Sequence, residues 1–374
     1  ILTNDKNDFL FFTAAGTHSS SPFDEYGTVP TLAERSGDFT GLTTPAGDKI
    51  TLYDPATGLP YGPCTGGANA GNPNSQCIPA AEIQPQATAL LSYVPLPNLP
   101  GANQNYQRLI SAGTNTTRLG VRLMHSFGSQ GGANPLLRLA RQFLGQGNSG
   151  ITQSLFGNFN YSHSASDTRN LFPQFGGTNQ IHQYALQLGY SIGKGRLTNA
   201  ITAGWNQTHT QASNSFSNVT DIAAQLGRNG LPQAPQLWGL PNVTMNQFSS
   251  LSEQQPDFQL AETVSIGDMS SWIHGKHTIR FGADFRRVYQ DEIGNTNSTG
   301  TYVFTGLFTQ QPGTSSTGNS GQNGFALSGS SLADFLLGMP QETTLQAAYQ
   351  ESHLRQNEID FFGQDDWRAG KSLT

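Results

Sequence analysis

Charged residues are scarce in this sequence. Only 12% of its 374 residues are Asp, Glu, Lys or Arg, about half of the roughly 25% that is usual in soluble globular proteins. The 25 acidic residues outnumber the 19 basic ones, so the net charge is −6. Because the chain is acidic and its Lys and Arg are scattered, we expect no nucleic-acid partner. The shortage of charge also argues against the surface of an ordinary cytosolic enzyme.

Long hydrophobic runs are missing as well. The sequence holds no stretch of about 20 apolar residues, which excludes a transmembrane helix, and its mean hydropathy is −0.40. A transmembrane β-strand needs only about 9 to 11 residues, and its alternating pattern barely raises the hydropathy. A membrane-spanning β-barrel is therefore compatible with the composition. Aromatic residues make up 10% of the chain, which is too many for a disordered protein.

Alternation of apolar and polar residues is the clearest pattern that is present. Within residues 277–286, Phe281 and Phe285 point to one side. Arg280 and Arg286 point to the other, because side chains alternate along a strand. Similar runs predict an antiparallel sheet in chain order with strands at 8–18, 117–128, 153–165, 181–192, 196–210, 258–272, 277–290 and 355–367. Aromatic residues at the expected strand ends fit interfacial girdles, although each alone fits a core position equally well; they are Trp205, Trp272, Tyr289 and Trp367.

The connections between these runs alternate in length. Those at 193–196 and 273–277 are short enough for tight hairpins. The connections on the other side are long and polar, at 19–116, 166–180, 211–257 and 293–354. Short turns on one side and long loops on the other are typical of outer-membrane barrels. The connection at 129–151 departs from this rule, and its apolar residues at helical spacing predict a small amphipathic helix.

Six segments of the chain carry a resemblance to a known family. They read TVPTLAERSGDF (28–39), LYDPATG (52–58), VPLPN (94–98), HTIRFGADFR (277–286), LADFLLG (332–338) and QDDWR (364–368). In this order they resemble the large TonB-dependent outer-membrane receptors of the Oar-like type, which carry a carboxypeptidase-regulatory-like domain in front. The chain begins with Ile1 and ends at Thr374 just after a predicted turn, so we interpret it as a segment of a longer protein.

The resemblance implies a specific architecture and set of partners. Residues 1–374 would be an all-β, antiparallel transmembrane β-barrel segment with long extracellular loops, about a third of a roughly 22-stranded barrel. The plug, the TonB box and the later strands would lie outside it. The expected partners are the TonB complex, through the missing plug, the lipid of the outer membrane, and an extracellular ligand of unknown identity.

Cysteine is rare, and the two cysteines lie close together in the first long loop. Cys64 and Cys77 enclose a stretch rich in Gly, Asn and Pro. We interpret them as a disulfide, because outer-membrane proteins pass through an oxidising periplasm. Closing so short a loop contributes about 3 kcal/mol in the chain-entropy model. The alternative, a metal site, needs further ligands, and no His lies nearby.

Charges on the polar sides of the predicted strands form the second set of candidate residues. They are Arg118, Arg122, Arg280, Asp284 and Arg286. We expect them to face the barrel lumen, because a Lys or Arg facing lipid at mid-membrane costs about 2 to 4 kcal/mol. Their expected role is to pair with one another or with the plug. A role in guiding a substrate is the alternative.

Catalytic and cofactor motifs are absent. The sequence contains no H-E-x-x-H, no G-x-S-x-G and no G-x-G-x-x-G between a strand and a helix. His274 and His277 fit a polar turn better than a metal site, because two ligands are too few for zinc. The carboxylates Glu358, Asp360, Asp365 and Asp366 fit a solvated strand better than acid–base catalysis. We therefore expect no catalytic, metal or cofactor-binding residues and no cofactor.

The sequence favours a non-enzymatic receptor of the outer membrane. In this hypothesis the loops capture a scarce ligand, a carbohydrate, peptide or metal chelate, and TonB energises its uptake. The first alternative is an outer-membrane protein for adhesion, secretion or surface assembly, without transport. The second alternative is a soluble, secreted β-sandwich that binds carbohydrate.

Overall fold

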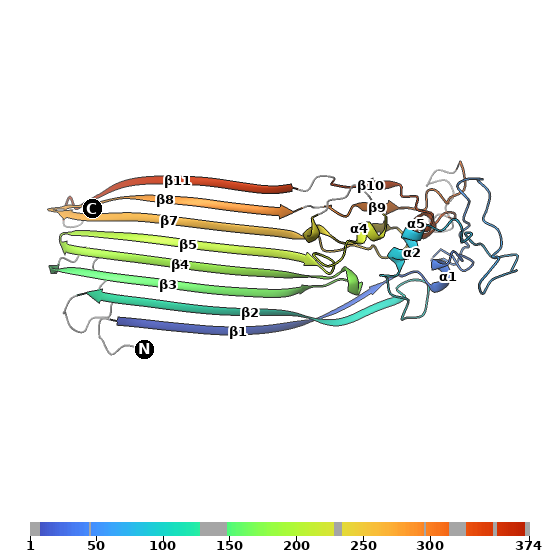
Figure 1. Cartoon of the computed structure of the whole chain (residues 1–374), viewed down its shortest axis with the longest axis horizontal. Helices are drawn as coiled ribbons and strands as arrows, with labels where there is room; N and C mark the ends of the chain where they lie inside the picture. The colour runs from blue at the N-terminus through green and yellow to red at the C-terminus, as the bar shows by residue number, and fades with distance from the viewer. Residues whose placement is uncertain are drawn as a thin grey trace.

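The computed structural model describes residues 8–44, 46–127, 148–227, 234–294, 297–313, 327–346 and 350–370. Its main feature is one antiparallel sheet of eight long strands (Figure 1). They are β1 (Asp8–Gly27), β2 (Tyr106–Phe127), β3 (Asn148–Thr168), β4 (Gly177–Gly195), β5 (Leu197–Asn214), β7 (Asp257–His274), β8 (His277–Gly294) and β11 (Gln350–Trp367). All eight predicted runs form strands, and each pairs with the next one along the chain. The prediction of an all-β antiparallel fold is confirmed.

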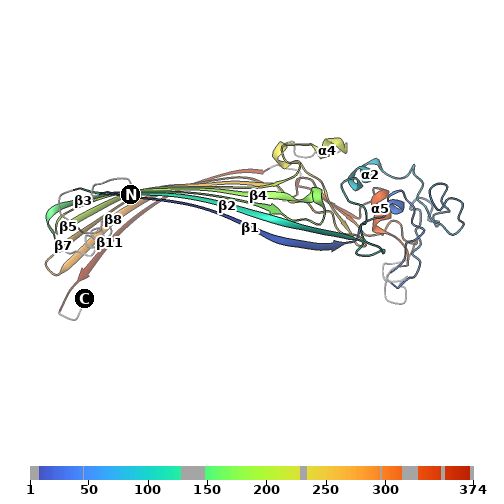
Figure 2. The same ribbon diagram turned by 90° about the horizontal axis from the view of Figure 1, so that it is seen from below.

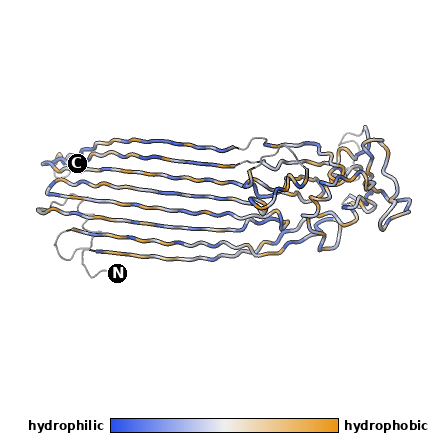
Figure 3. Tube along the Cα trace, in the orientation of Figure 1, coloured by the Kyte–Doolittle hydropathy of each residue, from blue (hydrophilic) through white to orange (hydrophobic). Residues whose placement is uncertain are grey.

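Pairing in register gives this sheet two unlike faces. Phe285 of β8 lies opposite Ile266 of β7 and Ile359 of β11. Directly opposed residues of an antiparallel pair share a face, so these three side chains lie together. We call the face that carries Phe285 the apolar face, and the face that carries Arg280 the polar face. The alternation is visible along each strand in Figure 3.

The strands are longer than the sequence predicted. β1 continues to Gly27 and β2 begins at Tyr106, so the first long connection covers only residues 28–105. Each of the eight strands has 18 to 22 residues, about twice what a bilayer crossing requires. The added ends show no regular alternation of apolar and polar residues, so the sequence pattern did not mark them as strand.

Two short turns lie at the end of the sheet far from the long connections (Figure 1). Arg196 alone separates β4 from β5, and residues 275–276 separate β7 from β8. Gly195 and Gly275 have φ of 61° and 60°, which glycine adopts without steric cost. Both predicted hairpins are confirmed. The helix predicted within 129–151 lies outside the described residues, while Ile151 belongs to β3.

The four long connections fold together at the other end of the sheet (Figures 1 and 2). We call the described parts of residues 28–105, 169–176, 215–256 and 295–349 the cap. Its helices are α1 (Leu32–Arg35), α2 (Pro85–Leu91), α4 (Ile222–Gln225) and α5 (Ser331–Leu336), with single 3-10 turns at Pro173–Phe175 and Pro235–Leu237. Its strands are β6 (Asn242–Met245), β9 (Thr301–Phe304) and β10 (Glu342–Thr344), with β9 in the middle of a small mixed sheet.

The cap has a hydrophobic core that all four connections share. Phe39, Phe172, Leu240 and Leu332, one from each connection, are at most 1% exposed and belong to one cluster. The expectation of four long polar loops is therefore wrong in this respect. Their apolar residues are spaced without periodicity, which hid the core from pattern analysis. Among the described residues, no helix is long and apolar enough to cross a membrane.

The large sheet stands as a single layer beside the cap (Figure 2). A β-sandwich requires two sheets packed face to face. In the described residues the second sheet is the small one of β6, β9 and β10, which lies in the cap. This arrangement rules out the soluble sandwich as a description of the fold.

Candidate functional site

The apolar face exposes a broad hydrophobic surface. It carries the exposed side chains Leu119, Val121, Leu123, Leu188, Ile201, Ile266, Phe281, Phe285 and Ile359. An apolar area spread over so many strands is far larger than the patches that water-soluble monomers expose. Hydrocarbon is the environment that such a surface requires.

Aromatic residues limit this hydrophobic surface at both ends of the strands. Trp272 and Trp367 lie near the short turns, as predicted for a girdle. Trp205 and Tyr289 lie within β5 and β8, because both strands continue toward the cap. The apolar stretch of β5, from Leu197 to Trp205, matches the roughly 9 to 11 residues of a bilayer crossing. The strands therefore extend beyond the membrane on the cap side.

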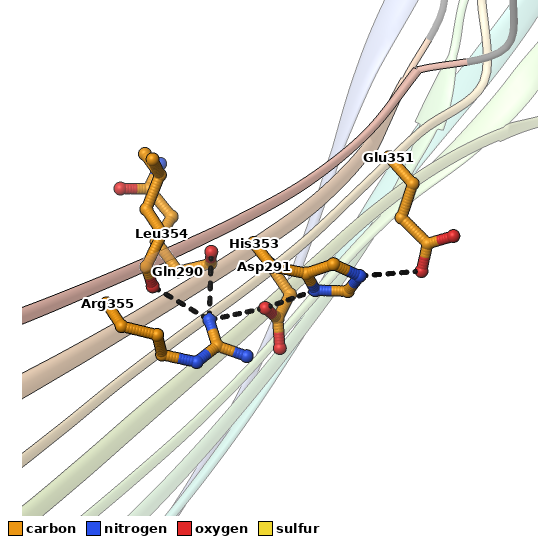
Figure 4. A network of polar contacts seen from close by, with 6 residues as sticks. All are labelled: Gln290, Asp291, Glu351, His353, Leu354 and Arg355. Carbon is orange, nitrogen blue, oxygen red and sulfur yellow. Dashed lines mark hydrogen bonds and ion pairs between the residues drawn. The ribbon is translucent and has the colours of Figure 1, made fainter.

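The same face becomes polar beyond this limit. Asp291 of β8 accepts hydrogen bonds from Arg355 at 2.6 Å and from Nδ1 of His353 at 2.8 Å. Nε2 of His353 lies 3.2 Å from Glu351 (Figure 4). All four residues share a face with Phe285, so the change from apolar to charged follows the strand direction. These groups belong in water or among lipid headgroups.

Polar groups also lie on the apolar face, and two of them near the short turns have partners. Asn199 donates a hydrogen bond to Asp268 at 2.6 Å. His125, which breaks the alternation of β2, pairs with Asp8 of β1. Both pairs lie nearer the short turns than the cap. Pairing lowers the cost of placing such groups beside lipid, because an unsatisfied polar group there would lose its hydrogen bonds to water.

All five charges predicted to share a polar environment lie on the polar face. Arg280 pairs with Asp366 at 2.8 Å, and Arg286 lies 3.2 Å from Glu358. Asp284 lies 4.0 Å from Arg286. Glu358 and Asp366 of β11 are thus ion-pair partners. Asp365 points to the opposite face, as expected from alternation, and contacts His277 at 2.7 Å.

Arg118 and Arg122 make no ion pair within the described residues. Arg122 belongs to the same cross-strand row as Asn158, Gln187 and Arg286, which the register connects through β3, β4, β5 and β7. The row therefore has one unpaired arginine on β2 and one paired arginine on β8. A group that approaches the polar face meets a free positive charge on the β2 side.

A hollow of 270 Å³ lies on the polar face between these arginines. Gly204 forms its floor, because a Cβ there would come within 2.7 Å of the Ser265 hydroxyl. Uncharged amides surround it, from Asn158, Asn160, Gln187 and Asn206. Amides both donate and accept hydrogen bonds. The hollow can therefore hydrogen-bond a neutral polar group.

A larger cleft of 380 Å³ lies in the cap between α2, α5 and the small sheet. Its walls are mainly apolar and aromatic, from Leu90, Leu226, Val243, Phe304 and Phe335, with Gln84, Gln86 and Tyr302 among the polar contributors. Small-molecule sites typically have this mixture of apolar walls and a few polar groups. Sequence analysis missed the cleft, because its residues come from three connections.

The two cysteines form a disulfide within the cap. The Cα atoms of Cys64 and Cys77 lie 5.0 Å apart. With Asp38 they are the one group of three potential metal ligands, among the described residues, whose ligand atoms lie within 4.8 Å of one another. The two sulfurs are bonded to each other, so this group closes the loop by a covalent bond.

A buried carboxylic acid lies elsewhere in the cap. The Glu253 side chain accepts a hydrogen bond from the backbone N–H of Leu240 at 2.6 Å, while its second oxygen has no hydrogen-bond partner. Burial raises the pKa of Glu253 to about 9. The group is therefore protonated and uncharged at neutral pH.

Comparison with known proteins agrees with this geometry. A family model described as an outer membrane beta barrel domain matches residues 5–134 and 137–374. The chain belongs to this family. No curated protein and no solved structure gives a significant match. Family membership confirms the predicted barrel class and places the protein in the bacterial outer membrane.

Membership of the outer-membrane barrels orients the parts just described. In such barrels the apolar side faces lipid and the long connections lie outside the cell. The cap and its cleft are therefore extracellular, and the short turns are periplasmic. We expect the polar face, with its five charges and its hollow, to line the interior of the closed barrel.

Proposed function

We propose that this outer-membrane barrel is part of a TonB-dependent receptor of the Oar-like type, which captures a scarce ligand outside the cell and takes it up. The observation that carries the proposal is the cap, whose connections fold around a shared core instead of extending separately. A folded cap holds its cleft open in a fixed shape, and preorganisation of this kind lowers the entropic cost of capturing a dilute ligand. The six family-like segments support the receptor type.

The cap cleft and the two faces of the sheet fit the successive steps of such uptake. The cleft, bounded by Phe304 and Phe335, is the site of first capture. The amides around Gly204 then offer hydrogen bonds along the interior. Arg118 and Arg122, which lack ion-pair partners within the described residues, would pair with a plug inside the barrel. Energy would arrive from the TonB complex through that plug, while outer-membrane lipid contacts the apolar face.

A binding experiment with the full-length protein tests the proposal. The coding region upstream of residue 1 should specify a plug preceded by a TonB box. The purified periplasmic domain of TonB should bind the full-length protein in detergent, and deletion of the TonB box should abolish this binding. A full-length protein without a plug, or one that does not bind TonB, would favour adhesion, secretion or surface assembly instead.

A further inference from the structure

Three histidines form a row across three adjacent strands. His163 of β3 lies directly opposite His182 of β4, which in turn lies opposite His209 of β5. The row is on the apolar face, one step toward the cap from Tyr161 and Tyr184. It therefore lies just outside the hydrocarbon region, where water and lipid headgroups meet. Neither the family nor the uptake hypothesis assigns a role to it.

The backbone holds these imidazoles close together. The rings of His163 and His182 stack with centroids 4.1 Å apart and an interplanar angle of 8°, and the centroids of His182 and His209 lie 6.3 Å apart. Neighbouring strands are about 4.8 Å apart and hydrogen-bonded along their length. The Cα atoms of the three histidines therefore stay adjacent unless the sheet opens.

One nitrogen of the row lacks a partner. Nε2 of His163 is buried and has no hydrogen-bond partner in the described structure. An imidazole nitrogen without a partner and away from water is destabilising. The neighbouring Tyr161 hydroxyl lies 3.5 Å from Nδ1 of His182 and leaves that ring oriented within the row. Coordination to a metal ion would give the Nε2 atom of His163 the partner that it lacks.

Imidazole is a preferred ligand of zinc, copper and nickel. Three imidazoles and one water or other oxygen complete a tetrahedral zinc site. The rings are stacked in this structure, so their in-plane nitrogen lone pairs do not converge, and all three rings must turn about their side-chain bonds to reach one ion. This is a side-chain rotation, and the register of the strands needs no change.

We propose that His163, His182 and His209 bind one divalent transition-metal ion of the zinc type on the outer surface of the barrel. The bound ion joins β3, β4 and β5 just above the lipid boundary, and it keeps one coordination position open to the surroundings. This site is distinct from the cap cleft and does not depend on ligand uptake.

Metal titration of the full-length protein in detergent, purified without a polyhistidine tag, tests the proposal. Co²⁺ provides absorption bands that report coordination, and Zn²⁺ should displace it with a stoichiometry of one. His182→Ala and His209→Ala should each weaken Zn²⁺ binding at least about tenfold. The matched control is the double variant His274→Ala and His277→Ala, which removes the chain's other directly opposed histidine pair and should leave the affinity unchanged.

The folded state of each variant is checked by its β-sheet circular dichroism and by its heat-dependent mobility in gels. The proposal is wrong if the folded wild-type protein binds neither ion. It is also wrong if folded His182→Ala binds Zn²⁺ as tightly as wild type, or if the His274 and His277 variant is the one that loses binding. If His182→Ala weakened Zn²⁺ binding and His209→Ala did not, the three-ligand proposal would be wrong, and His163 and His182 would form a two-ligand site.

Discussion

Single polar residues hold the cap together, and they occur in the segments that resemble known receptors. The Arg35 guanidinium donates to four backbone carbonyls, including those of Leu91 at 2.9 Å and Val94 at 2.8 Å. Asp334 accepts from the backbone N–H of Thr309 at 3.0 Å and from its hydroxyl at 2.7 Å. Burial raises the pKa of Asp334, and these donors oppose that effect. Arg35 and Asp334 thus join separate segments of the cap.

Replacing Arg35 with Lys should weaken the cap without affecting the barrel. A lysine ammonium is compact and cannot reproduce the planar fork that reaches several carbonyls at once. Hydrogen bonds to a charged group contribute about 1.5 to 3 kcal/mol each, so we expect Arg35→Lys to destabilise the cap by about that amount. Limited proteolysis of the cap in folded protein measures the effect. Lys49→Gln is the control, because Lys49 is exposed and contacts a single carbonyl.

Glu253 should make the stability of the cap depend on pH. Its folded pKa of about 9 exceeds the ordinary value of 4.5, so the folded state holds a proton that the unfolded state releases. Stability is therefore highest below about pH 4.5 and falls as the pH rises toward about 9. Thermal unfolding of the cap between pH 5 and 9 should show this decrease. Glu253→Gln should flatten the profile and raise stability at pH 8, and an unchanged slope would contradict this assignment.

At the scale of elements, a strand could be predicted from the sequence wherever its two faces meet different environments. In β8 the alternation of Phe281 and Phe285 with Arg280 and Arg286 reflects lipid on one side and a polar space on the other. Beyond the membrane both faces meet water, so residues such as those from Gln211 to Asn214 carry no alternation, and these strand ends were missed. Turn chemistry was informative, because glycine marks both hairpins.

The cap was not predictable by the same reasoning. Its core residues, such as Phe39 and Leu332, come from segments with no helical or strand period and meet only through tertiary packing. The cleft depends on this packing, so its lining could not be found. The row of His163, His182 and His209 was hidden for a related reason, since the residues are distant in sequence and become neighbours only through the strand register.

The two environments of β8 give an element-scale prediction. Phe281→Arg places a charge among lipid chains and should cost about 2 to 4 kcal/mol at mid-membrane, so the full-length protein should assemble poorly. Arg280→Gln on the polar face should leave assembly intact, although it removes the contact with Asp366. The fraction of protein that migrates as a folded, heat-modifiable band in outer-membrane preparations measures assembly. Equal effects of the two substitutions would contradict the assignment of the faces.

The first connection offers a second element-scale prediction, which concerns Cys64 and Cys77. In native protein without reductant, neither thiol should react with an alkylating reagent, whereas both should react after reduction and unfolding. Replacing both cysteines with Ser should destabilise this part of the cap by about 3 kcal/mol, because the unfolded loop regains its freedom. Mass spectrometry counts the alkylated sites, and faster proteolysis of residues 60–80 reports the loss of stability. Alkylation of both thiols in native protein would contradict the pairing.

At the scale of the whole molecule, a membrane-spanning sheet and an extracellular domain are built from alternating segments of one chain. Each hairpin that crosses the membrane therefore ends in a piece of the cap, and the cap core joins pieces from all four connections. Displacement of one hairpin would pull on that shared core. Under the proposed function, a ligand that tightens the cap would favour one arrangement of the hairpins beneath it, and capture would thereby be linked physically to the barrel.

The two edge strands carry the last prediction. β1 and β11 each pair on one side only in the described sheet, and they expose large apolar side chains, with Phe12 62% and Phe361 80% accessible. Unpaired backbone groups cannot remain in contact with lipid, so we expect further strands from outside residues 1–374 to cover both edges in the closed barrel. Residues 1–374 expressed alone should therefore aggregate or require detergent, because free edges recruit other chains. The full-length chain should insert as a closed barrel with heat-modifiable mobility in gels. If residues 1–374 instead formed a soluble, cooperatively folding monomer, this account of the edges would be wrong. It would also be wrong if residues 1–374 formed a heat-modifiable barrel in which cysteines introduced on β1 and β11 cross-link to each other, because the sheet would then close on itself.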